Sequence, residues 1–250
     1  MSINADKILA LKTDKTVYKD RDTVLKVFDQ NYSKSDIIYE ALNQSVVEEA
    51  GLNVPKVLEI TQLDGKWSIR SEFIPGKTLE RLMQENPEKY DDYLEQFVDI
   101  QQSIHQKETR LLSNMKDEMN RIILGSDMDA TVRYELHTRL AAMSNLNKIC
   151  HGEFYPTNII IRDDGVPFIL DWGHASKGNA SADAAQTFLL LQKESKTEAA
   201  DKYLKLFAEK SGIDLKYVHK WIPIVAASAA VEENRENREF LLQWVDFIKF

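Results

Sequence analysis

A short β-hairpin flanked by polar side chains, within residues 149–173, constrains the fold more than any other stretch of the sequence. Two apolar runs, at residues 159–161 and 167–170, enclose the polar turn Arg-Asp-Asp-Gly, which predicts two strands joined by a tight connection. Asn158 directly precedes the first run, and Asp171 directly follows the second. Because a hairpin brings its open ends together, we expect these two side chains to be neighbours in space.

The polar residues around this hairpin have the chemistry of a cation site. An amide oxygen and a carboxylate side by side suit a hard cation such as Mg²⁺, so we predict Asn158 and Asp171 as metal ligands. Glu153 lies on the loop that leads into the hairpin, where a base would face that metal. Either ligand alone could be structural, with Asn158 capping a turn and Asp171 ending a strand. The prediction therefore depends on the whole set in this order and spacing.

The composition of the 250-residue chain limits the classes of protein that it can be. A hydrophobic content of 43% is enough for one large domain or for two lobes that share a cleft. The net charge of −8 argues against a nucleic-acid partner, which would require a basic face, and is compatible with a cationic substrate. The single cysteine, Cys150, excludes an internal disulfide, and we interpret it as a buried core residue.

We find no pattern of a targeting signal or a membrane span. The N-terminal residues 1–7 lack the apolar core of a signal peptide. The longest apolar run, at residues 221–231, is too short to cross a bilayer and contains Pro223. We therefore expect a soluble cytoplasmic protein without a membrane partner. The sequence does not indicate an oligomeric state.

The elements that the sequence predicts fall into a strand-rich part and a helical part. In the first part the apolar period predicts a helix over residues 36–50, with Ile37, Ala41 and Leu42 on one side. Short β-branched runs predict strands at residues 8–11, 16–18, 23–28, 57–61 and 67–74. After the break at Pro75 and Gly76, helical spacing predicts helices at residues 78–84, 87–104, 114–124, 129–143, 181–191, 197–211, 216–231 and 237–249. This order predicts an α+β fold with an N-terminal lobe at residues 1–75 and a helical lobe at residues 76–250.

The stretch around the hairpin resembles the catalytic core of the aminoglycoside phosphotransferase and choline kinase family. That family has His-Gly-Asp, four residues, Asn, and then a hairpin followed by Asp and an aromatic residue. Here the corresponding residues are His151, Glu153, Asn158, Asp171 and Trp172. The resemblance extends over nearly the whole chain. It implies a two-lobed protein-kinase-like fold, with a small β-rich N-lobe and a larger helical C-lobe.

The resemblance also implies a nucleotide site in the N-terminal part. Lys26 and Glu40 stand where the family has a strand lysine and a helix glutamate, a pair that holds the α- and β-phosphates of ATP. Lys26 lies in an otherwise apolar strand, where burial requires a partner, although it could instead face solvent on the open side of the sheet. Glu72 and Ile74 resemble the hinge, whose backbone groups bind the adenine edge.

Further roles around the hairpin follow from the same resemblance. Asn158 and Asp171 would hold Mg²⁺ across the β- and γ-phosphates, and Glu153 would orient the acceptor hydroxyl and take its proton. His151 and Asp183 are implied as structural support, with Asp183 bracing the catalytic loop through backbone N–H groups. A small-molecule hydroxyl acceptor would occupy the helical lobe, and aminoglycosides, choline-like amines and sugars all stay open as candidates.

Two departures from the family pattern keep other classes of protein open. Glu153 stands where the family has aspartate, and the turn at residues 12–15 lacks the glycine that lets backbone N–H groups approach phosphate. Lys15 and the hydroxyls of Thr13 and Thr16 could compensate, or nucleotide binding is weak. Both departures favour a nucleotide-binding pseudokinase as the alternative. A metal-dependent phosphohydrolase would use the same carboxylates, but Lys26 and the hinge pattern argue against it.

Overall fold

The computed structural model describes residues 7–11, 14–231 and 233–246, and its chain forms two compact units. The first unit combines Met1–Leu82 with Pro156–His174, and the second combines Met83–Tyr155 with Ala175–Phe250. The hairpin therefore groups with the N-terminal sheet, although helices precede and follow it in the sequence. The hydroxyl of Thr13, the acidic residue Glu232 and the predicted helix end at residues 247–249 lie outside the described residues.

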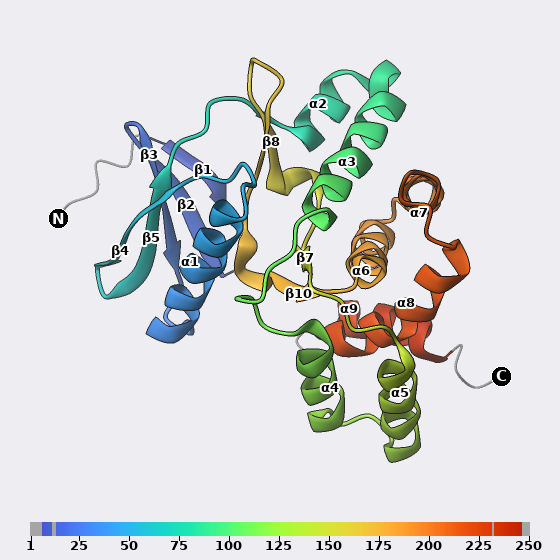
Figure 1. Cartoon of the computed structure of the whole chain (residues 1–250). Helices are drawn as coiled ribbons and strands as arrows, with labels where there is room; N and C mark the ends of the chain where they lie inside the picture. Colours follow the sequence, from blue (N-terminus) through green and yellow to red (C-terminus); the bar gives the residue numbers. More distant parts are fainter. Residues whose placement is uncertain (1–6, 12–13, 232, 247–250) are drawn as a thin grey trace. The chain divides into compact units, whose positions relative to one another are not determined.

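A five-stranded antiparallel sheet forms the larger part of the first unit (Figure 1). The turn between its fourth and fifth strands in the sequence uses Asp64 and Gly65, with φ of 48° and 80°. Positive φ at both positions is typical of a two-residue type I′ hairpin, which matches the twist of the strands. The strand order is β1-β2-β3-β5-β4, with β1 at Lys7–Leu11, β2 at Lys15–Asp20, β3 at Thr23–Phe28, β4 at Val57–Leu63 and β5 at Lys66–Glu72.

Helix α1, Lys34–Glu49, packs against this sheet (Figure 1). It begins with a capping box in which Ser33 and Asp36 bond each other's backbone N–H groups. Ile37 and Ala41 are buried together, but Leu42 is 52% exposed, so the prediction that Leu42 shares their side of the helix is wrong. The buried stripe instead follows the i, i+3, i+4 and i+7 positions from Ile37, which leaves Leu42 on another face. Those positions place Glu40 among the buried residues.

The predicted hairpin is confirmed and forms the second sheet of the first unit. Strands β8, Ile159–Ile161, and β9, Pro167–Ile169, pair antiparallel, and the unpredicted strand β6, Lys77–Thr78, adds to β8. Gly76 precedes β6 with φ of 150°, and a Cβ there would lie 2.3 Å from the carbonyl oxygen of Ile161. Only glycine allows this approach of two backbones. Short 3₁₀ turns flank the hairpin, η2 at Pro156–Asn158 and η3 at Trp172–His174.

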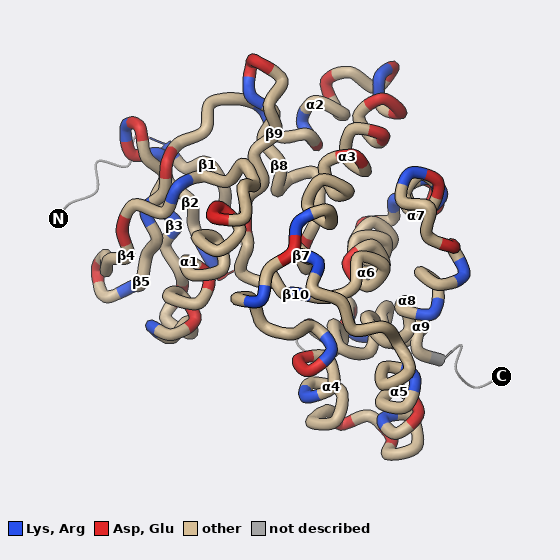
Figure 2. The backbone as a smooth tube through the Cα atoms, in the orientation of Figure 1, with Lys and Arg blue, Asp and Glu red and all other residues tan. Residues whose placement is uncertain are grey.

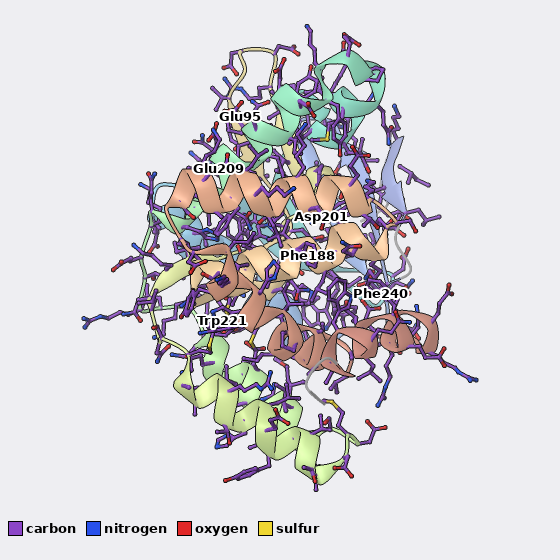
Figure 3. The ribbon with its side chains drawn as sticks, turned by 90° about the vertical axis from the view of Figure 1, so that its right-hand side faces the viewer. Glu95, Phe188, Asp201, Glu209, Trp221 and Phe240 are labelled. Atoms are coloured by element: carbon purple, nitrogen blue, oxygen red, sulfur yellow. The ribbon has the colours of Figure 1, made fainter. Side chains whose placement is uncertain are left out.

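Helices form most of the second unit. Figure 3 shows Phe188 of α6 and Trp221 of α8 among the packed helices, and both are buried, whereas Asp201 and Glu209 of α7 are exposed on its surface. The helices are α3 at Tyr90–His105 after the 3₁₀ turn η1 at Pro87–Lys89, α4 at Met115–Gly125, α5 at Ala130–Ala142, α6 at Ala180–Lys193, α7 at Thr197–Ser211, α8 at Leu215–Ala229 and α9 at Arg235–Asp246. Helix α2, Leu79–Glu85, spans the boundary between the units in the sequence, and the hydroxyl of Thr78 caps it by accepting the N–H of Arg81.

Ion pairs join α3 to α7 on the surface of the second unit. Lys202 pairs with Asp91, and Lys210 lies 2.8 Å from Glu95 and 2.7 Å from Asp99. Figure 2 shows charged residues on both helices. Such exposed pairs contribute little to stability, because water and salt screen them, so the buried face of α3 contributes more to the packing. Every helix in the described part of the chain is too short or too polar to traverse a lipid bilayer.

Candidate active site

A buried ion pair joins the sheet of the first unit to helix α1. Lys26 is in the middle of β3, and its Nζ lies 2.5 Å from Oε1 of Glu40. The two side chains are 17% and 10% exposed, so Lys26 does not face solvent. Burial lowers the pKa of Lys26, but the carboxylates of Asp171 and Glu40 outweigh it, and the pKa lies above its ordinary value. Lys26 is therefore a cation at every physiological pH.

The carboxylate of Asp171 gathers two ammonium groups. Its Oδ1 accepts a hydrogen bond of 2.8 Å from Lys26 and one of 3.0 Å from Lys15, the first residue of β2. The side chains of Lys15 and Asp171 are 10% and 7% exposed. Lys15, Lys26, Glu40 and Asp171 thus form one buried cluster of two cations and two anions, which we call the lysine–carboxylate cluster. All four residues belong to the first unit.

The backbone of Asp171 adopts a conformation that few residues with side chains adopt. Its φ is 66°, in the left-handed region, directly after β9. Such a conformation costs energy and persists where the surroundings determine it. Here the indole Nε1–H of the buried Trp172 donates to the carbonyl of Ile169 at 3.1 Å, and Nδ2 of Asn43 donates to the carbonyls of Trp172 and Gly173. These contacts fix the turn that carries Asp171.

The close approach of Glu40 to the same turn depends on Gly173. A Cβ at Gly173 would lie 3.2 Å from Oε2 of Glu40, which is tighter than most side-chain contacts. The absence of a side chain thus leaves room for the Glu40 carboxylate beside the backbone that follows Asp171.

The second predicted metal ligand, Asn158, lies at the other open end of the hairpin. Asn158 is 5% exposed. Its main-chain carbonyl accepts a hydrogen bond of 2.8 Å from the N–H of Leu170, the residue before Asp171. An amide and a carboxylate side chain are oxygen donors that suit Mg²⁺. No group of three or more His, Cys, Asp or Glu side chains gathers into a metal site within the described ranges. A cation held by Asn158 and Asp171 would therefore take its other ligands from phosphate and water, as Mg²⁺ commonly does.

The predicted hinge begins at Glu72, the last residue of strand β5. The N–H groups of Glu72 and Phe73 donate to the carbonyls of Lys56 and Asp22, at 3.0 and 3.2 Å. The side chain of Ile74 is 5% exposed. No other described residue forms a hydrogen bond with the backbone of Ile74. The carbonyl of Glu72 and the backbone of Ile74 are the groups that the hinge pattern assigns to the adenine edge.

Hydrogen bonds within the protein hold Asp14, which lies near the end of the glycine-free turn. The phenol of Tyr32 donates to the carboxylate of Asp14 at 2.5 Å, and the carbonyl of Asp14 accepts the N–H of Asp29 at 2.9 Å. Burial and the hydrogen bond to Asp14 raise the pKa of Tyr32, so the phenol stays protonated and donates. Lys15 follows Asp14 directly, and this anchoring fixes the strand start from which Lys15 reaches Asp171.

In the second unit, the loop that carries Glu153 is held on both sides of that residue. His151 is fully buried, and its Nδ1 accepts the N–H of Glu153 at 3.2 Å. The N–H of Gly152 donates to Oδ1 of Asp183 at 2.8 Å. Phe154 is fully buried and stacks on Phe97 of α3, with ring centroids 4.5 Å apart. The half-buried Glu153 is thus presented by a rigid backbone.

Asp183 is the centre of a buried hydrogen-bond network in the second unit. It is 1% exposed, and its Oδ2 accepts from Nε2 of His105 at 2.8 Å and from Nε2 of Gln101 at 3.2 Å. Because a carboxylate only accepts, His105 must be protonated at Nε2. Burial raises the pKa of Asp183, but its contacts with His105 first, and then with the N–H of Gly152 and with His151, hold this pKa below its ordinary value. Gln101 also donates to Thr187 and accepts from Tyr203.

Gln101 and His105 belong to this site, although no role was predicted for them. Both lie on the buried face of α3, where two polar residues four positions apart share one side of the helix. That spacing was the available signal, but only the fold shows that both side chains reach Asp183. Nδ1 of His105 is buried without a hydrogen-bond partner among the described residues. Cys150 is buried as predicted, and burial raises its pKa, which disfavours the thiolate.

The fold is α+β and protein-kinase-like. It pairs a buried lysine on a strand with a glutamate on a helix, and the unit that holds this pair also contains the hairpin. The model of the phosphotransferase enzyme family, APH, matches residues 13–215. The chain therefore belongs to this family, and the resemblance found in the sequence is confirmed. No curated protein matches the sequence at a significant level.

Solved structures of the same fold are similar over almost the whole chain. An apo thermostable mutant of aminoglycoside phosphotransferase APH(4)-Ia is 15% identical, with a TM-score of 0.73 over 97% of this chain and 92% of that one. Choline kinase LicA from Streptococcus pneumoniae is 16% identical, with a TM-score of 0.62 over 95% and 90%. Another thermostable APH(4)-Ia mutant, 16% identical with a TM-score of 0.71 over 97% and 92%, was solved as a ternary complex with AMP-PNP and hygromycin B. The fold is thus that of two-lobed small-molecule kinases.

Proposed function

We propose that this phosphotransferase transfers the γ-phosphoryl group of ATP to a hydroxyl group of a small molecule. The observation that carries the proposal is the lysine–carboxylate cluster, in which Glu40 fixes the ammonium of Lys26 beside Asp171. Phosphoryl transfer depends mainly on positioning and on neutralising charge, and a buried pair of this kind serves both needs. The AMP-PNP bound to a protein of the same fold supports a nucleotide as the donor.

The phosphates would be held by the two lysines of the cluster. Lys26 would bind the α- and β-phosphates, and Lys15 would supply a second ammonium from the start of β2. Both ammonium groups donate to one oxygen of Asp171. A phosphate that bound beside this oxygen would therefore be within reach of both lysines. When phosphate oxygens replace the carboxylate as acceptors, Asp171 becomes available as a metal ligand. Lys15 would thus compensate for a phosphate-binding turn without glycine.

The remaining nucleotide contacts would come from the hinge and from the open ends of the hairpin. The carbonyl of Glu72 and the backbone of Ile74 would bond the adenine edge. Asn158 and Asp171 would hold Mg²⁺, which neutralises charge on the β- and γ-phosphates. Residues 1–75 would form the nucleotide lobe and residues 76–250 the acceptor lobe of a cytoplasmic enzyme.

Glu153 would act as the base toward the acceptor. The acceptor oxygen forms a bond to the γ-phosphorus, the bond from that phosphorus to the β–γ bridging oxygen breaks, and ADP leaves. The hydroxyl proton passes to the carboxylate of Glu153. Glutamate and aspartate have nearly equal pKa values in water, about 4.3 and 3.9, so they do not differ much in basicity. They differ in the length of the side chain. The extra methylene misplaces the carboxylate for an acceptor seated for aspartate, which would give a slow enzyme.

A nucleotide-binding pseudokinase is the second candidate, and Glu153 together with the glycine-free turn favours it. Thermal shift with ATP, with and without Mg²⁺, and ADP release with hydroxylated acceptors separate the two. A kinase responds to nucleotide with metal and releases ADP with an acceptor, whereas a pseudokinase binds nucleotide without acceptor-dependent turnover. A response to Mg²⁺ alone would indicate a phosphohydrolase. Glu153→Gln should remove most of the acceptor-dependent rate, and Glu153→Asp should match or exceed the wild type.

A further inference from the structure

Three apolar side chains on the outer side of helix α1 are open to solvent. Ile38, Tyr39 and Leu42 are 44%, 40% and 52% exposed. They account for three of the eleven large apolar side chains that are exposed in the described part of the chain. The solvent-facing side of a helix that packs on a sheet is usually polar. A group of three so close together on one helix therefore indicates a surface that contacts another protein.

The same side of α1 carries a charge at each end. Lys34 is the first residue of the helix, Glu49 is the last, and both are exposed. Ser45, between them, is half-buried and has a small side chain. Residues 34, 38, 42, 45 and 49 follow one another at intervals of three or four, so they lie on one side of the helix. We call these residues the outer α1 face.

The two end charges of the outer α1 face are not neutralised by the described residues. Neither Lys34 nor Glu49 forms an ion pair with any residue in the described part of the chain. Nζ of Lys34 lies 5.4 Å from the ring centroid of Trp67, but this contact does not cancel its charge. By contrast, Lys66 of the same unit pairs with Asp29 at 3.0 Å. Lys34 and Glu49 are thus available to partners of opposite charge.

The outer α1 face is complementary to itself when a second copy of the helix lies antiparallel to it. With Leu42 near the centre of the pairing, Lys34 of each helix is level with Glu49 of the other. Ile38 is then level with the small side chain of Ser45, which leaves room for it. A parallel pairing would instead bring like charges together at both ends. Such a pairing is isologous, because the same surface serves both copies.

We propose that this protein forms a homodimer in which the α1 helices of two copies pack antiparallel along the outer α1 face. Burial of the exposed apolar side chains favours association, and the two pairs of Lys34 with Glu49 set the direction. One helix from each copy buries less area than a standard interface, so we expect a weak dimer with a Kd on the order of 10 μM. The buried side of α1, which carries Glu40, takes no part in this contact. The inference therefore does not depend on the proposed function.

Sedimentation velocity of the whole protein tests the proposal over concentrations from about 1 to 500 μM, on both sides of the expected Kd. The weight-average mass should rise from that of one chain toward that of two. Leu42→Glu places two carboxylates near the twofold axis, so this variant should stay monomeric over the whole range. Because Leu42 is exposed, its replacement should leave the Tm unchanged. Leu124→Glu is the matched control, since Leu124 is a leucine of α4 that is 47% exposed, and it should dimerise like the wild type.

Charge reversal tests the direction of the pairing. Lys34→Glu should raise the Kd of the dimer by about tenfold, because each of the two pairs changes from attraction to repulsion. Glu49→Lys should have the same effect. The double reversal restores both pairs, so its Kd should return to within about threefold of the wild type. An acid in the first turn and a base in the last turn suit the helix dipole, so unfolding of α1 would not explain a weaker dimer.

The outcomes decide both the contact and its direction. A wild type that stays monomeric up to about 500 μM overturns the proposal. A dimer that is as stable in Leu42→Glu as in Leu124→Glu does the same. Single reversals that weaken the dimer without rescue by the double reversal reject the antiparallel pairing. If Leu42→Glu lowers the Tm, the charge reversals decide alone. None of these measurements involves a nucleotide, so their failure would leave the proposed function untouched.

Discussion

The Nζ of Lys15 lies 3.0 Å from the same oxygen of Asp171 that accepts a hydrogen bond from Lys26 at 2.8 Å. Lys15 and Lys26 are on the adjacent strands β2 and β3, whereas Asp171 follows a hairpin more than a hundred residues later. One carboxylate thus brings together two cations from the sheet. In the proposed kinase, the same two ammonium groups would bind phosphate oxygens in place of this carboxylate oxygen.

The first prediction separates the roles of the two lysines. Lys15→Gln should raise KM for ATP by about tenfold with a smaller change in kcat, because it removes one charge pair to the phosphates and leaves Lys26 in place. Steady-state kinetics with varied ATP measures this split. Lys66→Gln is the control, since Lys66 also lies in the sheet and pairs with Asp29 at a half-exposed site. Equal kinetics for Lys15→Gln and the control would leave Lys15 without a role in nucleotide binding.

The second prediction concerns stability. Lys26→Met should destabilise the fold by about 2–4 kcal/mol, because it leaves the buried carboxylates of Glu40 and Asp171 with Lys15 as their remaining cation. The double variant Lys26→Met with Glu40→Gln should recover part of this loss, since it also removes one of the unpaired charges. Urea unfolding of both variants and the wild type measures the difference. A loss below 0.5 kcal/mol for Lys26→Met would contradict the buried pair.

The pH dependence of that loss follows from the direction of the pKa shift. The pKa of Lys26 is raised in the folded state, so its stabilisation is fully present below the unfolded pKa of about 10.4. It is lost only as the pH rises through the folded value. The difference between wild type and Lys26→Met should therefore be the same at pH 6, 7.5 and 9. A difference that shrinks across this range would contradict the assignment.

The third prediction uses the left-handed backbone of Asp171. Asparagine tolerates a φ near 66°, whereas alanine is strained there. Asp171→Asn removes the anion between Lys15 and Lys26, so it should lower the Tm, and it should lose Mg²⁺-dependent turnover, because an amide supplies no negative charge to a cation. Asp171→Ala should lose turnover and lower the Tm further, because it adds backbone strain to the same loss of charge. Differential scanning fluorimetry and ADP release distinguish the two variants, and full activity in Asp171→Asn would exclude Asp171 as a metal ligand.

The sequence allowed the fold to be predicted where local patterns determine it. Helix α7 matches its predicted residues 197–211, and the hairpin of β8 and β9 follows from two apolar runs around a turn. The strands β7, Lys148–Cys150, and β10, Ser176–Gly178, were not predicted, because three residues have no period and each strand depends on the other as its distant partner. The predicted position of Leu42 on the same side of the helix as Ile37 and Ala41 was wrong for a related reason. The sheet against which the helix packs determines which of its residues are buried, and the sheet is distant in the sequence.

Within the candidate site, residue types could be predicted but their contacts could not. The family resemblance implied that Lys26 and Glu40 form a pair, and in the structure Nζ of Lys26 lies 2.5 Å from Oε1 of Glu40. The bond from Lys15 to Asp171 could not be expected from local sequence, because it depends on how the hairpin packs against the start of β2.

The last prediction concerns the network that supports the loop of Glu153. His105→Leu removes a donor to the buried carboxylate of Asp183, so it should destabilise the fold by about 1–3 kcal/mol at pH 7. The folded pKa of Asp183 is lowered, so the stability that it contributes is present above its unfolded pKa of about 3.9 and is lost as the pH falls through the folded value. The difference between wild type and His105→Leu should therefore shrink below about pH 4.

Urea unfolding at pH 7 and at pH 3.5 tests this prediction, with His137→Leu as the control. His137 is half-buried on α5 and bonds the neutral Asn120, so its replacement should show no such convergence in acid. His105→Gln restores an N–H donor and should recover part of the stability at pH 7. Because Oδ1 of Asp183 holds the N–H of Gly152, His105→Leu should also lower kcat more than it raises KM for ATP. A stability loss in His105→Leu that stays constant from pH 7 to pH 3.5 would show that packing, and not the hydrogen bond to the Asp183 carboxylate, accounts for the effect of His105.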